Sequence, residues 1–421
     1  MKLLKFTSLK LIIFSGVLFV SCNTEKDSLI ETPDEIKNQV ELAHPEENYD
    51  EIVDIVFNNQ TLKAEKYGDE YIVEGDIVFT KEQLNNNLLN KGTGRTGGRW
   101  TKNIVYYNIK SDLPNKNRIS NAIAHIEART NLAFVKRESI TPMSNAYITF
   151  RKGSGCSSFV GRTGGKQYIT LANGCSTGSV IHEIGHAVGL WHEQSRVDRN
   201  EHITINNANI RDGKQHNFQT YAERGRDGKE YSSFDFSSIM LYSSYAFSKN
   251  GKPTITKKNG ATYTANRSYL SAKDKISLKK MYPQIHDVVT FKADNNKFLS
   301  SNEGVPNTNG PKFDRTRVGT LEHFRIIKLH NNKVALKGFG GKYLSVRPGN
   351  KVLCIGNNID AWEVFTLEFI GSNKVAIRGH NGKYLSSNGG SSVITCDRTN
   401  IGYWEKFSIS YKGRNAVNFT K

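Results

Sequence analysis

The alternation of apolar and polar positions divides the chain into regions of different character. Three lysines near the start precede an apolar run from Leu11 to Val20, which ends at Ser21. A run of this length is typical of an export signal and is too short to cross a bilayer as a mature helix. We therefore predict a signal segment (1–22), followed by an acidic leader (23–95). The repeats and resemblances described below place a first folded domain at 96–284 and a second at 286–421.

A polar, glycine-rich stretch over residues 84–99 predicts an exposed linker between the leader and the first domain. Trp100 follows the linker, and the apolar segment Ile104–Asn108 predicts the first strand of the domain. The linker offers three basic residues at which a protease could separate the leader from the domain, namely Lys91, Arg95 and Arg99.

From about residue 286 the chain repeats itself. Short apolar segments alternate with Asn/Gly turns in three copies of about 42 residues each. One set of aromatics is Phe298, Tyr343 and Tyr384, and a second is Phe324, Phe365 and Phe407, each of the second set preceded by Glu322, Glu363 or Glu405. The pattern resembles a β-trefoil of the fascin-like kind. This resemblance implies an all-β domain, a six-stranded barrel with a hairpin cap, whose core holds the repeated aromatics.

Charge separates the leader from the rest of the chain. Residues 23–90 hold 17 acidic and 5 basic side chains, a net charge of −12, whereas residues 91–421 carry +27. This asymmetry predicts attraction between the leader and the remainder, and it favours acidic substrates or anionic surfaces once the leader is gone. No nucleic-acid motif accompanies the charge, so we expect no nucleic-acid partner.

The most informative motif in the sequence is H-E-x-x-H-x-x-G-x-x-H, which begins at His182. On a helix, His182 and His186 lie one turn apart on the same face, and Gly189 can turn the chain so that His192 joins them. Three neutral imidazoles leave one position of a tetrahedral Zn²⁺ open for water. Glu183, next to the first ligand, is then the expected general base.

The residues after the motif extend the signal. The chain continues from His192 as Glu-Gln-Ser-Arg-Val-Asp-Arg, and residues 238–242 read Ser-Ile-Met-Leu-Tyr. This resembles the astacin family of metzincins, including its bacterial member flavastacin, although Leu241 stands where the family usually has His. The resemblance implies an α+β catalytic domain, a twisted sheet plus a zinc helix. It also implies that Met240 lies beneath the metal, that Tyr242 stabilises the oxyanion and that Glu193 meets the freed N-terminus.

The same resemblance assigns roles to a glycine-rich stretch that, read alone, would be a loop. It implies an edge strand that pairs with substrate, formed by Val160, Gly161, Arg162, Gly164 and Gly165. It also implies a disulfide between Cys156 and Cys175, worth about 3 kcal/mol in the chain-entropy model. The sequence leaves the pairing of Cys354 and Cys396 open.

Two features before the first domain bear on regulation and location. Gly75-Asp76 resembles the end of the astacin propeptide motif, which implies that Asp76 binds the zinc and displaces the catalytic water. Ser21-Cys22 resembles a lipoprotein cleavage box, which implies lipidation of Cys22 and anchoring in a bacterial envelope; simple secretion is the alternative. In either case the protein is exported.

Together these features predict an exported zinc metalloendopeptidase with one zinc ion, made as a latent zymogen and monomeric. We expect protein substrates, with acidic side chains favoured near the cut; Arg211, Arg224 and Arg226 are candidates for that pocket. The trefoil is expected to bind a glycan or cell-surface ligand, for which Tyr403 and Trp404 are candidates. The alternative function is a glycan-binding, adhesive surface protein with a vestigial peptidase domain.

Overall fold

The computed structural model describes most of the chain beyond the signal segment. Residues 37–421 form one compact unit. The described residues are 41–45, 48–57, 60–81, 84, 98–139, 144–224, 228–303, 310–329, 332–390 and 392–412. Cys22, Lys91 and Arg95 therefore lie outside the described residues. Among these residues, no helix is both long and apolar enough to span a membrane.

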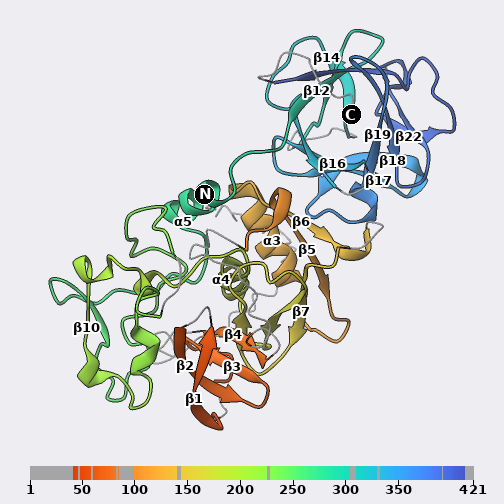
Figure 1. Cartoon of the computed structure of the whole chain (residues 1–421). Coiled ribbons are helices and arrows are strands. Elements are labelled where there is room, and N and C mark those ends of the chain that lie inside the picture. Colours follow the sequence, from red (N-terminus) through yellow and green to blue (C-terminus); the bar gives the residue numbers. More distant parts are fainter. Residues whose placement is uncertain are drawn as a thin grey trace, which may run out of the picture. The chain divides into compact units, whose positions relative to one another are not determined.

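A nine-stranded sheet runs through the leader and the first domain (Figure 1). The leader supplies β1 to β4 as an antiparallel meander, and β4 joins the domain through the parallel pair Ile77↔Ser158 on β8. The strands, in the order in which they pair, are β1 (Glu51–Phe57), β2 (Gln60–Tyr67), β3 (Glu70–Val73), β4 (Ile77–Thr80), β8 (Cys156–Ser158), β9 (Lys166–Leu171), β7 (Tyr147–Lys152), β5 (Ile104–Ile109) and β6 (Ala133–Lys136).

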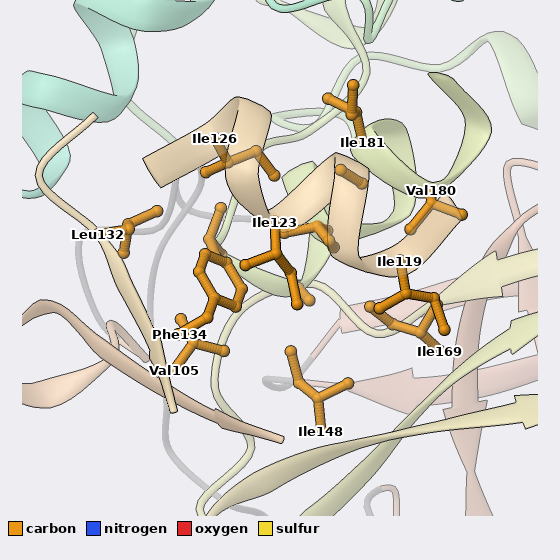
Figure 2. Close-up of a cluster of buried hydrophobic side chains, with 14 of the residues drawn as sticks. Val105, Ile119, Ile123, Ile126, Leu132, Phe134, Ile148, Ile169, Val180 and Ile181 are labelled. Carbon is orange, nitrogen blue, oxygen red and sulfur yellow. The ribbon is translucent and has the colours of Figure 1, made fainter. Parts of the chain in front are cut away.

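Two helices pack on the part of the sheet that the first domain supplies. Helix α3 (Asn117–Arg129) buries Ile119, Ile123 and Ile126, whose spacing of three and four residues places them on one helix face. Figure 2 shows these side chains directed toward Phe134 and Ile148 of the sheet and beside Val180 and Ile181 of helix α4 (Thr177–Ala187). This core fixes α4 against the sheet.

Helix α4 has well-defined ends. Its N-cap residue, Ser176, accepts a hydrogen bond from the Ser179 N–H, which satisfies one of the free donors of the first turn. Gly178 allows close packing, since a Cβ there would lie 1.6 Å from the Arg267 carbonyl oxygen. A third helix, α5 (Ala272–Met281), begins at a capping box between Ser271 and Asp274.

The segment between α4 and α5 is mostly irregular. It contains a small antiparallel pair, β10 (Ile203–Ile205) with β11 (Ile255–Lys257), and a separate core in which Phe218, Leu241 and Tyr242 are buried. Tyr242 of this segment lies beside His192.

The C-terminal domain closes a sheet on itself. Strands β12, β15, β16, β19, β20 and β23 pair in a ring, because β23 returns to β12. Three hairpins, one per repeat, complete the trefoil. The strands are β12 (Val288–Lys292), β13 (Phe298–Ser300), β14 (Lys312–Arg315), β15 (Phe324–Lys328), β16 (Lys333–Gly338), β17 (Tyr343–Arg347), β18 (Lys351–Gly356), β19 (Phe365–Gly371), β20 (Lys374–Gly379), β21 (Tyr384–Ser386), β22 (Thr395–Arg398) and β23 (Phe407–Tyr411).

The repeated aromatics divide between the core and the hairpins. Phe324, Phe365 and Phe407 are fully buried in the barrel, whereas Phe298 and Tyr384 are only partly buried. The expectation that all six aromatics form the trefoil core therefore holds for the second set and is wrong for the first, because Tyr343 is buried outside the barrel, in a cluster that includes Ala133 and Val135 of β6.

Candidate zinc centre

Three histidines converge at the end of α4. His182 and His186 lie one turn apart on the helix, which ends near Gly189; the positive φ of 105° there turns the chain back. His192 thereby comes within 5.3 Å of the His182 ring and 4.7 Å of the His186 ring, measured between centroids. All three rings are buried.

Each imidazole is oriented by a hydrogen bond at Nδ1. The partner of His182 is the Ile239 carbonyl (2.8 Å), and that of His186 is the Leu190 carbonyl (2.8 Å). The Nδ1 of His192 instead meets Glu74 Oε2 at 2.6 Å. Such contacts fix the tautomer and leave the Nε2 atoms as the ligating atoms.

The Nε2 atoms surround one leader carboxylate. Asp76 Oδ2 lies 3.2 Å from the Nε2 atoms of His182 and His192, and Asp76 Oδ1 lies 3.6 Å from that of His186. The four potential ligand atoms lie within 4.8 Å of one another, and His186 Nε2 has no hydrogen-bond partner among the described residues. Three imidazoles and one carboxylate in this arrangement suit a tetrahedral zinc ion.

Glu183 lies in the same buried centre. Neither of its carboxylate oxygens has a hydrogen-bond partner among the residues that the structure describes. Burial raises the pKa of Glu183 well above its usual range, and the negative charges of Asp76 and Glu41 add to the shift. An unpaired buried carboxylate costs free energy, so its position beside the histidines indicates a chemical role rather than a structural one.

Tyr242 and Met240 complete the lower side of the centre. The Tyr242 ring lies 4.6 Å from that of His192, and its hydroxyl donates a hydrogen bond to the Glu74 carbonyl (2.5 Å). Met240 packs beneath α4: a Cβ on Gly185 would lie 2.9 Å from the Met240 sulfur. Glycine at that position therefore lets the methionine approach the helix.

The leader enters the centre through two consecutive residues with left-handed backbone. Glu74 has φ 57° and Gly75 has φ 80°, so the chain bends sharply just before Asp76. The Glu74 side chain is fully buried and forms an ion pair with Arg224, while its N–H donates to Asn217 Oδ1 at 2.9 Å. Glu74 therefore bonds to the domain through its backbone and its side chain.

A third leader carboxylate, that of Glu41, pairs with an arginine near His182. Glu41 Oε2 accepts a hydrogen bond from Arg267 Nε at 2.7 Å. Arg267 also donates to the carbonyls of Ile239 and Leu241, and the first of these carbonyls is the one that orients His182. Its Nη2 has no hydrogen-bond partner among the described residues.

The stretch predicted to form the substrate edge follows strand β8. In the sheet β8 lies between β4 and β9; its Ser158 N–H donates to the Asp76 carbonyl and its Cys156 N–H to the Leu42 carbonyl. The residues expected to form that edge instead lie in the following loop, which turns at Gly161 (φ 74°) and Gly164 (φ 96°). Within this loop are Val160, Gly161, Arg162, Gly164 and Gly165.

The remaining predicted residues are placed as follows. Cys156 and Cys175 form a disulfide, and the other two described cysteines, Cys354 and Cys396, are free thiols. Glu193 is largely buried and accepts a hydrogen bond from the Asp235 N–H (2.9 Å); burial raises its pKa to about 8. Arg99 binds the Met281 carbonyl, so this candidate cut site is engaged in the folded domain.

Sequence reasoning missed Glu41, Glu74 and Arg267. Glu74 directly precedes Gly75-Asp76, and this neighbourhood was the only available signal. Arg267 is 226 residues from Glu41, so no local pattern could connect them. Of the three arginines proposed for an acidic pocket, Arg224 lies at the centre, Arg211 is exposed and Arg226 lies outside the described residues.

Comparison with known proteins agrees with this geometry. The profile of the Astacin peptidase family matches residues 93–283, and the Fascin domain profile matches residues 251–409. The chain is 34% identical over 217 residues to zinc metalloproteinase nas-4 of Caenorhabditis elegans, covering 50% of this chain and 68% of that protein. It is 39% identical over 202 residues to blastula protease 10 of Paracentrotus lividus, covering 46% of this chain and 34% of that protein.

A solved structure shows a related match. It is high choriolytic enzyme 1, a hatching enzyme zinc-protease of Oryzias latipes, with 29% identity and a TM-score of 0.40; the match covers 44% of this chain and 92% of that one. The chain spans about a third of blastula protease 10 and 42% of zinc metalloproteinase nas-15, so these relatives contain further regions. On the motif, the histidine geometry, the family profile and the match to nas-4, the chain belongs to the astacin family of zinc metalloendopeptidases.

Proposed function

We propose that the protein is an exported zinc endopeptidase made in a latent form. One observation carries the proposal: three buried Nε2 atoms face a leader carboxylate, Asp76, beside an unpaired buried carboxylate, Glu183. A vestigial domain would not need this arrangement, because a leader that fills the metal site has a purpose only if that site is active.

The residues of the centre have separable tasks in the proposed reaction. Bound zinc lowers the pKa of a coordinated water to about 7 and polarises the scissile carbonyl. Glu183 takes the proton of the attacking water and delivers it to the leaving amine. Tyr242 loses its present acceptor when Glu74 leaves, so its hydroxyl becomes free to donate to the developing oxyanion.

Latency in this proposal has two components. Asp76 occupies the position that water needs, and the leader covers the cleft by pairing with β8 through Ile77↔Ser158. A cut between residues 91 and 99 frees the leader to leave. If Cys22 is lipidated, as predicted, the same cut also releases the enzyme from the envelope.

We also propose a preference for acidic side chains near the scissile bond. The side chain of Arg267 is only 9% exposed and pairs with Glu41, so departure of the leader leaves a guanidinium with two unused donors, Nε and Nη2. A buried, unpaired cation is costly, and a substrate carboxylate would satisfy it in the place that Glu41 vacates.

The C-terminal trefoil is proposed to hold the enzyme near a glycan-bearing substrate or surface. Exposed aromatics support this role, among them Tyr403 (72% exposed) and Trp404 (45% exposed). Both can offer flat apolar faces to a ligand.

The test is digestion of a peptide library by protein that has been cut within residues 91–99. We expect fragments that disappear when a zinc chelator is added, and that are absent from the E183Q variant although it retains one zinc ion. Cleavage by E183Q at the wild-type rate would remove Glu183 as the base. No cleavage by leader-free wild type with full zinc content would favour the adhesive, vestigial alternative.

A further inference from the structure

The last strand of the nine-stranded sheet, β6, contacts the second repeat of the trefoil. The Lys136 N–H of β6 donates a hydrogen bond to the Ile359 carbonyl (3.1 Å), beside a parallel bridge between Val135 and Ile359. An edge strand otherwise presents unpaired backbone groups to solvent. The trefoil therefore satisfies part of an edge that belongs to the peptidase domain.

Apolar side chains from both domains fill the space beside this contact. They form one buried cluster, separate from the core of the peptidase domain and from that of the barrel. Its members include Ile104, Tyr106 and Val135 of the first domain and Ile327, Ile359 and Val364 of the trefoil. Separation of the two domains would expose these side chains to water, which opposes separation.

A buried carboxylate of helix α3 takes its cation from the trefoil. Glu127 is 3% exposed and accepts hydrogen bonds from Lys337 Nζ (3.3 Å) and from the Tyr343 hydroxyl (3.1 Å). Among the described residues, Lys337 is the cation that forms an ion pair with Glu127, and it is only 5% exposed. Without the trefoil, helix α3 would keep a carboxylate that has lost its counter-charge.

The same pair of a cation and a ring recurs in all three repeats, but its surroundings differ. In strand register the pairs are Lys292 with Phe298, Lys337 with Tyr343 and Arg378 with Tyr384. In each repeat the cation lies over its ring. In the third repeat, however, Arg378 forms an ion pair with Glu368 of the trefoil itself (3.2 Å), and both side chains reach solvent. The second repeat instead directs its pair at the peptidase domain.

The residue after the repeated glutamate distinguishes the second repeat in the same way. It is His323 in the first repeat, Val364 in the second and Lys406, which is exposed, in the third. Four residues before that glutamate, Val318 of the first repeat is 42% exposed, whereas Ile359 of the second is fully buried. The second repeat therefore has apolar, covered residues at positions that are polar or exposed in the other repeats.

We propose that the second repeat is a permanent docking face for this chain's own peptidase domain. The trefoil is then a structural part of the peptidase and not a module on a flexible tether. Helix α3, which Glu127 joins to the trefoil, packs against the zinc helix α4, so the dock supports the element that carries two of the metal ligands. The proposal concerns the face turned toward the first domain and does not depend on what the trefoil binds elsewhere.

A matched pair of variants in the full-length latent protein tests the buried ion pair. Calorimetric unfolding of the wild type should show one transition for both domains. K337M leaves Glu127 without its cation and should lower Tm by about 5 °C or more. R378M removes the equivalent cation of the third repeat, whose ion pair is solvent-exposed, and should leave Tm within about 1 °C of wild type.

Hydrogen exchange tests the dock itself. V364K gives the second repeat the residue that the third repeat has, and K406V is the reverse change. We expect V364K and K337M to speed amide exchange over residues 133–136, while strands β20 and β23 of the barrel stay protected; K406V should match wild type. Two separate transitions in the wild type, equal Tm values for K337M and R378M, or unchanged exchange over 133–136 in both V364K and K337M would each overturn the proposal. Peptide cleavage enters none of these measurements, so the dock and the proposed activity can fail independently.

Discussion

At the scale of single residues, the candidate centre contains acidic side chains of the leader that pair with basic side chains of the first domain. Glu41, Glu74 and Asp76 of the leader meet Arg267, Arg224 and the three histidines respectively. All of these side chains are buried except that of Arg267, which is 9% exposed, and removing one partner of a buried pair typically costs about 3–5 kcal/mol. Each leader carboxylate therefore contributes to closing the site.

Glu74 should help the latent protein to retain zinc. Its carboxylate orients His192 through Nδ1, and loss of such an outer contact typically lowers metal affinity by about 10–100-fold. We expect E74Q and D76N proenzyme to lose zinc to a competing chelator faster than wild type. E51Q is the matched control, because Glu51 pairs with Lys66 inside the leader. Equal rates for all four proteins would contradict this role.

Arg267 should set the preference for acidic substrates. In leader-free enzyme, R267Q is expected to lower kcat/KM for an Asp-containing peptide by about 10-fold or more relative to its Asn analogue, since loss of a buried charged hydrogen bond costs about 1.5–3 kcal/mol. Because Arg267 also supports the Ile239 carbonyl, the ratio between the two peptides is the informative readout. The exposed Arg211 provides the control, R211Q, whose ratio should match wild type.

Sequence could identify the residues whose roles follow from short spacing and could not identify those defined by long-range pairing. His182, His186, Gly189 and His192 lie within eleven positions, so helix geometry alone brings them together. Arg267 and Glu41 meet only because the leader folds back over the cleft. No periodic pattern in the sequence indicates that these two residues are in contact.

At the scale of elements, the packing of α3 against the loop before α5 contains a titratable contact. His125 Nε2 accepts a hydrogen bond from the Leu270 N–H at 3.1 Å, which requires the neutral imidazole. Burial, together with the charges of Arg129 and Lys275, lowers the pKa of His125 to about 4. This contact makes the junction of the two helices sensitive to acid.

Stability should therefore fall as pH drops from about 6.5 to about 4. In that window the unfolded chain, with a histidine pKa near 6.5, binds more protons than the folded chain. Thermal unfolding followed by circular dichroism at several pH values should show the decline. H125Q should reduce its slope without removing it, because burial also lowers the pKa of His286 to about 4. An unchanged slope in H125Q would exclude this contact as a source.

The hairpins of the trefoil show that a sequence can predict a strand without predicting how far its side chains are buried. The threefold spacing of aromatics predicts the repeat, yet Phe298 and Tyr384 lie at the first position of a hairpin strand with one side open. Tyr343 occupies the same position and is fully buried. Equivalent positions in a repeat share backbone geometry, but their neighbours decide their exposure.

At the scale of the whole molecule, charge and topology both set the leader apart. The segment 23–90 carries −12 and the rest of the chain after it +27, and the contacts between them include Lys214 with Glu65 at 2.7 Å. Attraction between such surfaces decreases as salt screens it. The leader should therefore stay associated after the cut when ionic strength is low.

Gel filtration of protein cut within residues 91–99 checks this expectation. At low ionic strength the leader should elute with the enzyme and peptidase activity should stay low. At about 1 M salt, where the screening length is about 3 Å, the leader should separate and activity should rise. Cut D76N protein should release its leader at lower salt than wild type. Co-elution that does not change with salt would show that apolar and backbone contacts dominate.

The nine-stranded sheet has a consequence for how the active protein must be handled. If the leader leaves after the proposed cut, four of these strands leave with it, and β8 becomes an edge whose backbone groups an extended chain can bind. The edge that is proposed to pair with a substrate would then pair with a neighbouring copy of the enzyme as well. The latent form should thus be the one that tolerates storage and high concentration, and the active form should be short-lived by construction.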